Sequence, residues 1–282
     1  MSGALCISID VELAWGVWER PHPESLVRAS EERSIVRALV ALFERHEVSA
    51  TWAIVGRLLD RDPDRRPDVW FAPEVIDTIR AAKVPQDIGS HSYAHVYFTD
   101  TPRDELRRDL AQARQVHDAH GLPFTSFVFP KNRVAHTDLL AEAGVRVFRS
   151  VDRGWHIDAR ERFGQAAGRV ANLVDKLLPI TPRVVEPIRH AGIVELPSSM
   201  LLMARTGLRR AARPAAVRAK ARRGLAAAVE TGKTFHLWFH PSNFYVDGER
   251  QLAILEDIVA EAASLRRREG LEIRPMSAFA SC

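Results

Sequence analysis

Short apolar runs alternate with amphipathic helical patterns along most of the chain, and this alternation limits the possible folds more than any other feature. The runs are rich in β-branched and aromatic residues, and the last helical pattern places Leu252, Leu255 and Val259 on one face. Strands that alternate with helices predict parallel βα units, and seven or eight strands favour a complete or incomplete (β/α) barrel over an open doubly wound sheet. The expected strands are 4–9, 50–55, 87–89, 126–129, 145–148, 193–196, 235–239 and 271–273, and the expected helices are 31–46, 74–82, 103–120, 137–143 and 249–268.

The length of 282 residues fits one such barrel, because α/β barrels of about 250 residues commonly form a single domain. A composition of 46% hydrophobic and 27% charged residues is typical of soluble globular proteins. The alternation stops between about residues 160 and 232, where we expect a basic helical insertion. We therefore predict a single domain over residues 1–282 with that insertion.

The two cysteines, Cys6 and Cys282, exclude a disulfide framework and a cysteine-based zinc site. Any metal must therefore be held by histidines and carboxylates. The N-terminal residues lack the pattern of a signal peptide, and no run approaches the ~20 apolar residues of a membrane-spanning helix. We expect a cytoplasmic protein.

Two carboxylates, Asp10 and Glu12, end the first expected strand. Residues two apart in an extended chain point to the same side, and in parallel α/β folds sites form at the carboxyl ends of strands. Both side chains can therefore face one pocket. The alternative is an Asp10 that caps a loop beside a solvated Glu12.

Two histidines, His91 and His95, follow the third expected strand. Histidines four apart on a helical turn lie on one face and can share a metal ion. Two histidines with one carboxylate leave coordination positions open for water, as in a catalytic metal site. The alternative is a hydrogen-bonded pair at the start of a helix.

A third histidine, His240, ends the strand 235–239, where it can deliver a proton to a leaving group. His236 lies deeper on the same side, and we expect it to pack in the interior. The strand 126–129 ends at Pro130, which places the backbone N–H groups and cations of Lys131 and Arg133 near a developing oxyanion.

Together these motifs resemble those of the polysaccharide deacetylases of the NodB-homology type, carbohydrate esterase family four. The resemblance implies that Asp10 is the catalytic base, that Glu12, His91 and His95 bind the metal, and that His240 is the general acid. It also implies that the N–H of Lys131 belongs to an oxyanion hole. The matching segments are SIDVE (8–12), HSYAH (91–95), SFVFPK (126–131), IVELP (193–197) and LWFH (237–240), with a weaker echo in DRGW (152–155).

The activity that this resemblance implies is metal-dependent removal of an N-acyl group, N-acetyl above all, from an amino sugar, a glycan or a carrier-linked sugar. Zinc suits the ligand set, and Co²⁺, Ni²⁺ or Mn²⁺ are alternatives. The runner-up activities are hydrolysis of a cyclic or linear non-peptide amide and non-catalytic carbohydrate binding. For substrate contacts we expect Trp15 and Trp18 as an aromatic wall, unless they pack under a loop, with Tyr93, Arg133 and Trp155 as further candidates.

The sequence departs from the family pattern in two places. Asp10 and Glu12 are separated by Val11, as in a subgroup with peptidoglycan-deacetylase-like and allantoinase-like members. Val128 stands where the family has an arginine that contacts the base. Lys131 or Arg133 are the candidates to replace that arginine.

A basic segment, Met203–Lys233, carries nine basic residues and one acid, whereas the rest of the chain is net negative. The simplest interpretation is a solvated helical face. The second is binding to an anionic membrane surface, at the inner face, or to a phosphorylated carrier, because leucines and a methionine accompany the arginines. Nucleic acid ranks last, because no binding motif and no interleaved aromatic residues are present.

Overall fold

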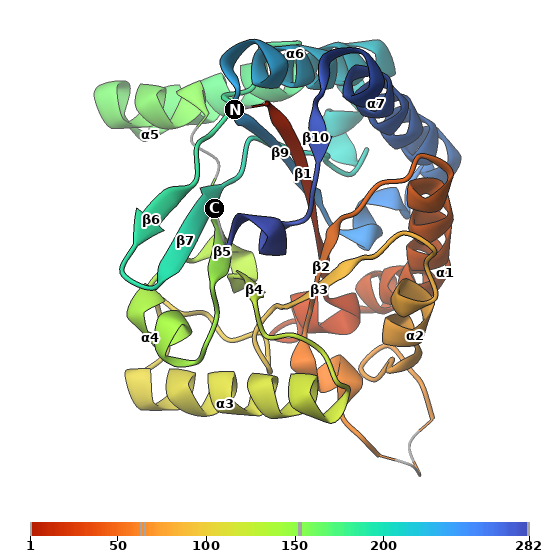
Figure 1. The fold of residues 1–282 in the computed structure, drawn as a ribbon, viewed down its shortest axis with the longest axis vertical. Helices are drawn as coiled ribbons and strands as arrows, with labels where there is room; N and C mark the ends of the chain where they lie inside the picture. Colours follow the sequence, from red (N-terminus) through yellow and green to blue (C-terminus); the bar gives the residue numbers. More distant parts are fainter. Residues whose placement is uncertain (1, 63, 65, 152–153, 281–282) are drawn as a thin grey trace.

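Most strands lie in the centre of the molecule with helices around them, whereas β6 and β7 lie at its left edge (Figure 1). The computed structural model describes residues 2–62, 64, 66–151 and 154–280. Within these residues one ten-stranded sheet runs in the order β6-β7-β5-β4-β3-β2-β1-β9-β8, and β10 pairs with β1 beside that path. Its strands are β1 (Ala4–Val11), β2 (Thr51–Ile54), β3 (Asp87–Ser90), β4 (Ser126–Val128), β5 (Val147–Ser150), β6 (Ile188–His190), β7 (Ile193–Pro197), β8 (Met200–Leu201), β9 (Thr234–Phe239) and β10 (Glu272–Ile273).

The curled sheet confirms the predicted distorted (β/α) barrel. Its strand pairs are parallel except for β6 with β7. The helices are α1 (Pro23–Arg45), α2 (Glu74–Arg80), α3 (Arg103–Ala119), α4 (Thr137–Glu142), α5 (Trp155–Leu177), α6 (Pro214–Thr231) and α7 (Gly248–Glu269), with short 3₁₀ helices η1 (Leu13–Val17), η2 (Gly56–Leu59), η3 (Pro130–Asn132), η4 (Gly207–Ala211), η5 (Pro241–Phe244) and η6 (Met276–Phe279).

Strand β1 shows how the barrel positions polar side chains. All eight of its residues are buried, because parallel strands of such folds are covered on both faces. Leu5, Ile7 and Ile9 belong to the large core under the helices, whereas Cys6 belongs to a smaller interior cluster. Since side chains alternate along a strand, Ser8 and Asp10 share the interior side with Cys6.

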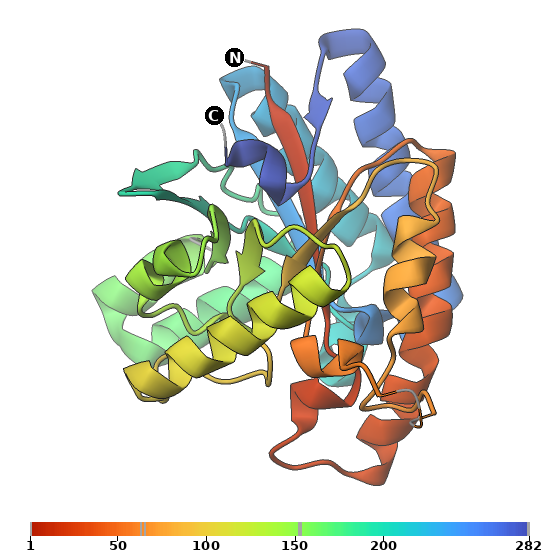
Figure 2. The same ribbon diagram turned by 60° about the horizontal axis from the view of Figure 1, so that its bottom comes forward.

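The C-terminal segment closes the amino-terminal end of the barrel interior. Met276 and Phe279 of η6 pack in the interior cluster, and Figure 2 shows η6, in dark blue, beside the start of β1. The backbone N–H of Met276 donates to Thr51 Oγ1 at 2.7 Å, and that of Ser277 donates to Asp87 Oδ2 at 3.2 Å. Helix η6 therefore covers the end of the barrel opposite the carboxyl ends of β1 and β3.

Two sequence predictions about elements need correction. The region 160–232 is not one helical insertion: α5 and α6 are helical, and between them the short strands β6 and β8 join the sheet in addition to β7, which matches the expected strand 193–196. Helix α1 begins at Pro23 rather than near residue 31, because His22 and Ser25 form a capping box and Pro23 fits the first turn. No helix among the described residues is both long and apolar enough to span a membrane.

Candidate active site

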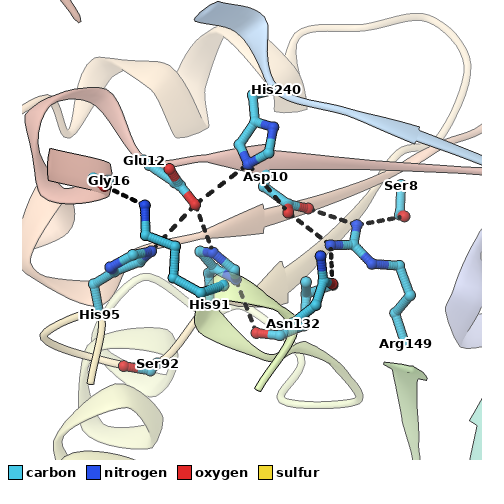
Figure 3. A network of polar contacts seen from close by, with 12 residues as sticks. Ser8, Asp10, Glu12, Gly16, His91, Ser92, His95, Asn132, Arg149 and His240 are labelled. Carbon is cyan, nitrogen blue, oxygen red and sulfur yellow. Dashed lines mark hydrogen bonds and ion pairs between the residues drawn. The ribbon is translucent and has the colours of Figure 1, made fainter. Parts of the chain in front are cut away.

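Glu12, His91 and His95 converge on one point at the carboxyl ends of β1 and β3 (Figure 3). Glu12 Oε1 lies 3.0 Å from His91 Nε2 and 3.1 Å from His95 Nε2. Both imidazoles are fully buried, and the Glu12 side chain is 13% exposed. The prediction that these three side chains lie together is therefore correct.

The contact of His91 with the backbone determines which of its ring nitrogens faces this cluster. His91 Nδ1 lies 2.8 Å from the carbonyl oxygen of Val128, which only accepts, so Nδ1 carries the proton. Its Nε2 is therefore the nitrogen that faces Glu12 Oε1. Burial lowers the pKa of His95 despite the opposing charge of Glu12, which favours the neutral ring that binds a metal. One carboxylate oxygen and two imidazole nitrogens that lie within 4.8 Å of one another form a donor set that a divalent cation can share.

The histidine pair is held by a loop and not by the predicted helical turn. Residues 91–95 contain no helix, and Ser92 and His95 have positive φ values of 65° and 56°. Buried Asp109 of α3 holds this loop: its carboxylate accepts from the N–H of Tyr93 at 2.9 Å and of Ala94 at 2.8 Å. The sequence did not reveal this anchor, because Asp109 lies in an otherwise ordinary helical pattern.

Asp10 forms a buried two-point ion pair with Arg149 of β5. The guanidinium donates to Oδ1 and Oδ2 of Asp10, each at 2.7 Å, and Arg149 is fully buried. Burial opposes ionisation of Asp10, but the charges of Arg149, His240 and His91 and the hydrogen bonds from Arg149 together outweigh it and lower the pKa of the carboxyl from its ordinary value. Asp10 is therefore held as a carboxylate in a fixed orientation.

Arg149 occupies the role that the family pattern assigns to the position of Val128. Val128 of β4 and Arg149 of β5 are direct partners in the sheet register, so an arginine at either position enters the interior at the same level. The candidates suggested by the sequence were wrong. Lys131 Nζ donates to the carbonyl of Gly16 at 2.6 Å, and Arg133 pairs with Asp100.

A chain of hydrogen bonds supports Arg149 from the interior. Its NH1 donates to Ser8 Oγ at 3.0 Å, and Ser8 Oγ lies 2.9 Å from His236 Nε2. His236 Nδ1 lies 3.2 Å from the carbonyl of Pro197, so Nδ1 carries the proton and Ser8 donates to Nε2. Burial lowers the pKa of His236 to about 3, which keeps the ring neutral. His236 therefore does more than pack.

His240 stands beside both carboxylates at the end of β9. Its Nε2 lies 3.6 Å from Asp10 Oδ2 and 3.5 Å from Glu12 Oε1. Burial favours the neutral ring, but the charges of Glu12 and Asp10 outweigh burial and raise the pKa of His240 to about 9. The ring is thus protonated near neutral pH, as a proton donor requires.

The turn after β4 brings two further groups to the site. Lys131 and Asn132 both have a φ of 53°, which is unusual for residues with a side chain. Asn132 Oδ1 accepts from Arg149 NH2 at 3.0 Å, so the turn is tied to the Asp10 ion pair. Strained backbone of this kind is retained where the surrounding contacts determine it.

The aromatic candidates are spread around the site. Trp15 is half-buried against Trp70, whose carbonyl accepts from its indole N–H at 3.0 Å. Trp18 is 41% exposed. The hydroxyl of Tyr93 donates to Asp60 Oδ2 at 3.2 Å. The side chain of Trp155 and residues 152–153 of the expected fourth motif lie outside the part of the chain that the structure describes.

Comparison with known proteins finds similarity to polysaccharide deacetylases in part of the sequence and in the fold. The polysaccharide deacetylase family model matches residues 29–148. A Mycobacterium smegmatis protein assigned as a polysaccharide deacetylase is 19% identical, with 99% of this chain and 88% of that chain covered and a TM-score of 0.69. These matches confirm the resemblance to polysaccharide deacetylases that the motifs predicted.

Two further solved structures share the fold. A Pseudomonas aeruginosa protein assigned as a polysaccharide deacetylase is 15% identical over 99% of this chain and 89% of its own, with a TM-score of 0.66. An allantoinase is 13% identical over 99% and 89%, with a TM-score of 0.68. No curated protein matches the sequence.

Proposed function

We propose that the protein is a metal-dependent hydrolase that removes an N-acyl group from an amino sugar or glycan. The observation that carries the proposal is the convergence of Glu12 Oε1 with His91 Nε2 and His95 Nε2, at 3.0 and 3.1 Å, beside Asp10 and His240. One carboxylate and two imidazoles suit Zn²⁺, and the same donors accept Co²⁺, Ni²⁺ or Mn²⁺.

In this proposal the residues of the chain divide the chemistry among them. When bound, a divalent cation supplies polarisation of the amide carbonyl and acidification of a water molecule. Asp10, held by Arg149, takes the proton of the attacking water. His240, which stands beside Asp10 and Glu12, donates a proton to the departing amine. The backbone N–H of Lys131 donates to the oxyanion that forms on the carbonyl oxygen.

The substrate we propose is an acylated amino sugar, free, in a glycan or linked to a carrier. Trp15, Trp18, Tyr93, Arg133 and Trp155 are the side chains that we propose contact it. A hydrolase of a cyclic or linear non-peptide amide would use the same central groups. A non-catalytic carbohydrate-binding protein would have no need for the full set of Asp10, Glu12, both histidines and His240.

Release of acetate and free amine from N-acetylated amino sugars, free and carrier-linked, tests this function. We expect hydrolysis by the metal-loaded protein, and its loss with a chelator, in Asp10→Asn and in His91→Ala. A parallel assay with cyclic and linear amides separates the alternative activity. Equal product release in wild type, both variants and chelated protein would refute the proposal.

A separate proposal concerns the basic segment Met203–Lys233. Several of its cations have ion-pair partners within the molecule, so the proposal is limited to the exposed ones. The ion pairs of this segment are Arg205–Asp247, Arg218–Asp257, Lys220–Asp175 and Lys233–Glu186. The exposed members are Arg209, Arg210, Arg213, Arg222 and Arg223. We propose that these arginines contact an anionic lipid surface or a phosphorylated carrier. Co-sedimentation with anionic liposomes that weakens as salt rises supports this contact, and equal sedimentation with neutral liposomes contradicts it.

A further inference from the structure

A cavity of about 190 Å³ lies next to the candidate active site. It is lined by β8 and the residues that follow it, by η4 and α6, and by the end of α5, and it is partly open because Leu178 and Arg209 of its lining are exposed. Leu201, Met203, Ala216 and Val217 are among its apolar lining residues, and Trp238 is another.

The cavity is too large to be an ordinary packing defect. Protein interiors are packed about as densely as organic crystals, and voids much larger than a water molecule are few. It lies against β8, which is the last strand of the sheet path, so α5 and α6 cover the open side of an incomplete barrel there. An apolar space retained at such a place suits a ligand.

Trp238 connects this cavity to the groups proposed to act on the substrate. Its ring lies 4.3 Å from Cζ of Arg149, which holds Asp10. The ring centroid of Trp238 also lies 5.6 Å from that of His240. One side chain therefore borders the cavity, the ion pair of the proposed base and the proposed acid.

Most polar side chains of the lining, Arg205, Lys220 and Gln251 among them, already have partners within the protein. Lys220 Nζ donates to the carbonyl of Asp175 at 2.7 Å and pairs with its carboxylate. Gln251 Nε2 donates to the carbonyl of Met203 at 2.8 Å. A sugar would lose hydrogen bonds to water in this cavity, whereas an alkyl chain would lose none.

We propose that this cavity, which we call the acyl pocket, binds the alkyl chain of an N-acyl group longer than acetyl. A cavity of about 150 Å³ holds benzene, so the acyl pocket has room for roughly six to eight carbons. The proposal rests on the proposed function and refines its substrate class to N-hexanoyl- or N-octanoyl-amino sugars.

The kinetic test compares N-acetyl-, N-hexanoyl- and N-octanoylglucosamine as substrates. In wild type we expect kcat/KM to be at least about tenfold higher for the two longer chains, since each buried methylene can contribute a factor of this size. Val217→Phe and Ala216→Leu fill the acyl pocket and should remove this preference. Ala226→Phe, at an exposed position of the same helix, should keep it. A preference for acetyl in wild type would overturn the proposal.

A binding measurement separates the pocket from the proposed function. Sodium hexanoate should raise the melting temperature of wild type and Ala226→Phe more than sodium acetate does, and this difference should vanish in both pocket-filling variants. Hexanoate binding without hydrolysis of any glucosamide supports the pocket and contradicts the proposed substrate. Equal shifts with hexanoate and acetate in wild type would overturn the pocket, even if N-acetylglucosamine is hydrolysed.

Discussion

Arg149 is the buried cation that fixes Asp10, and it reaches Asp10 from a strand that the motif pattern does not include. Its guanidinium is fully buried and has four hydrogen bonds, to both oxygens of Asp10, to Ser8 and to Asn132. A buried charge that loses its partner destabilises a protein by about 3 to 5 kcal/mol. Arg149 therefore has to be judged by both stability and activity.

An exchange of neighbours tests this role of Arg149. Arg149→Val should lower kcat by about 100-fold or more, because a misplaced base loses its alignment with the water. Adding Val128→Arg returns the arginine from the paired position on β4 and should recover at least about tenfold of that loss. Steady-state kinetics measures both effects. Arg146→Val, at an exposed position, is the control.

The double variant, Arg149→Val with Val128→Arg, could fold and still be no more active than Arg149→Val. That result would show that pairing of the two positions in the sheet does not by itself let β4 supply the arginine. Circular dichroism and melting curves of each variant separate this result from a failure to fold. Unchanged kcat in folded Arg149→Val would remove the positioning role altogether.

Residue spacing was enough to predict that Asp10, Glu12, His91, His95 and His240 lie near one another, because each stands at or just beyond the end of an apolar strand. Arg149 could not be predicted in this way, since its contact with Asp10 depends on the register of β4 with β5. The available hint was a charged residue inside an apolar run, Val147–Ser150. The contacts of Ser8 with Arg149 and with His236 could not be predicted for the same reason.

At the scale of elements, η1 and the loop 91–95 bring the candidate metal ligands together. Helix η1 turns directly after Glu12 and carries Gly16 back to its carboxylate. A Cβ at Gly16 would overlap Glu12 Oε2, so a larger residue there would displace that carboxylate oxygen. The carboxylate of Glu12 is thus oriented by the turn that follows it.

Gly16→Ala should displace the Glu12 carboxylate and weaken metal binding. We expect the dissociation constant for Zn²⁺ to rise about 10- to 100-fold, the usual effect of disturbing the groups that orient a ligand. Competition with a chromophoric chelator measures it. Gly248→Ala is the matched control, because a Cβ there meets nothing within 4 Å. Equal zinc affinity in both variants would contradict the role of η1.

Most elements followed from periodicity, but β6, β8 and α6 did not. Strand β8 has two residues and β6 has three, which is too short for an alternating pattern to be visible. Helix α6 carries alanines and arginines in place of a clear apolar stripe. The left-handed residues of the loop 91–95 are held by Asp109, a contact between segments that no local pattern contains.

At the scale of the whole molecule, buried neutral histidines link stability to pH. His117 of α3 is buried, and its Nδ1 lies 2.8 Å from the carbonyl of Pro123. Burial lowers the pKa of His117 to about 4 from its ordinary value of 6.5. The unfolded chain therefore binds a proton at a higher pH than the folded protein does.

The free energy of unfolding should fall as pH decreases from 6.5 to about 4, with His117 contributing up to about 3 kcal/mol. Above pH 6.5 the ring is neutral in both states and contributes no pH dependence. In His117→Asn the free energy of unfolding should be lower at neutral pH. Between pH 6.5 and 4 it should fall by up to about 3 kcal/mol less than in wild type. Urea titrations of metal-free protein between pH 7.5 and 4 test this, with exposed His22→Asn as control. Parallel curves for wild type and His117→Asn would contradict it.

The barrel, its closed amino-terminal end and the polar cluster at the carboxyl ends of β1, β3 and β9 together support a metal-dependent hydrolase. The central claim is that Glu12, His91 and His95 hold one divalent cation while Asp10 and His240 handle protons. Metal binding and hydrolysis should therefore be separable by substitution.

Metal content of the zinc-loaded, desalted protein is the most direct test of this claim. Elemental analysis should find one equivalent of zinc per chain in wild type and in Asp10→Asn, and less than about a tenth of an equivalent in His91→Ala and His95→Ala. Stoichiometric zinc in both histidine variants, or no retained metal in wild type, would contradict the account.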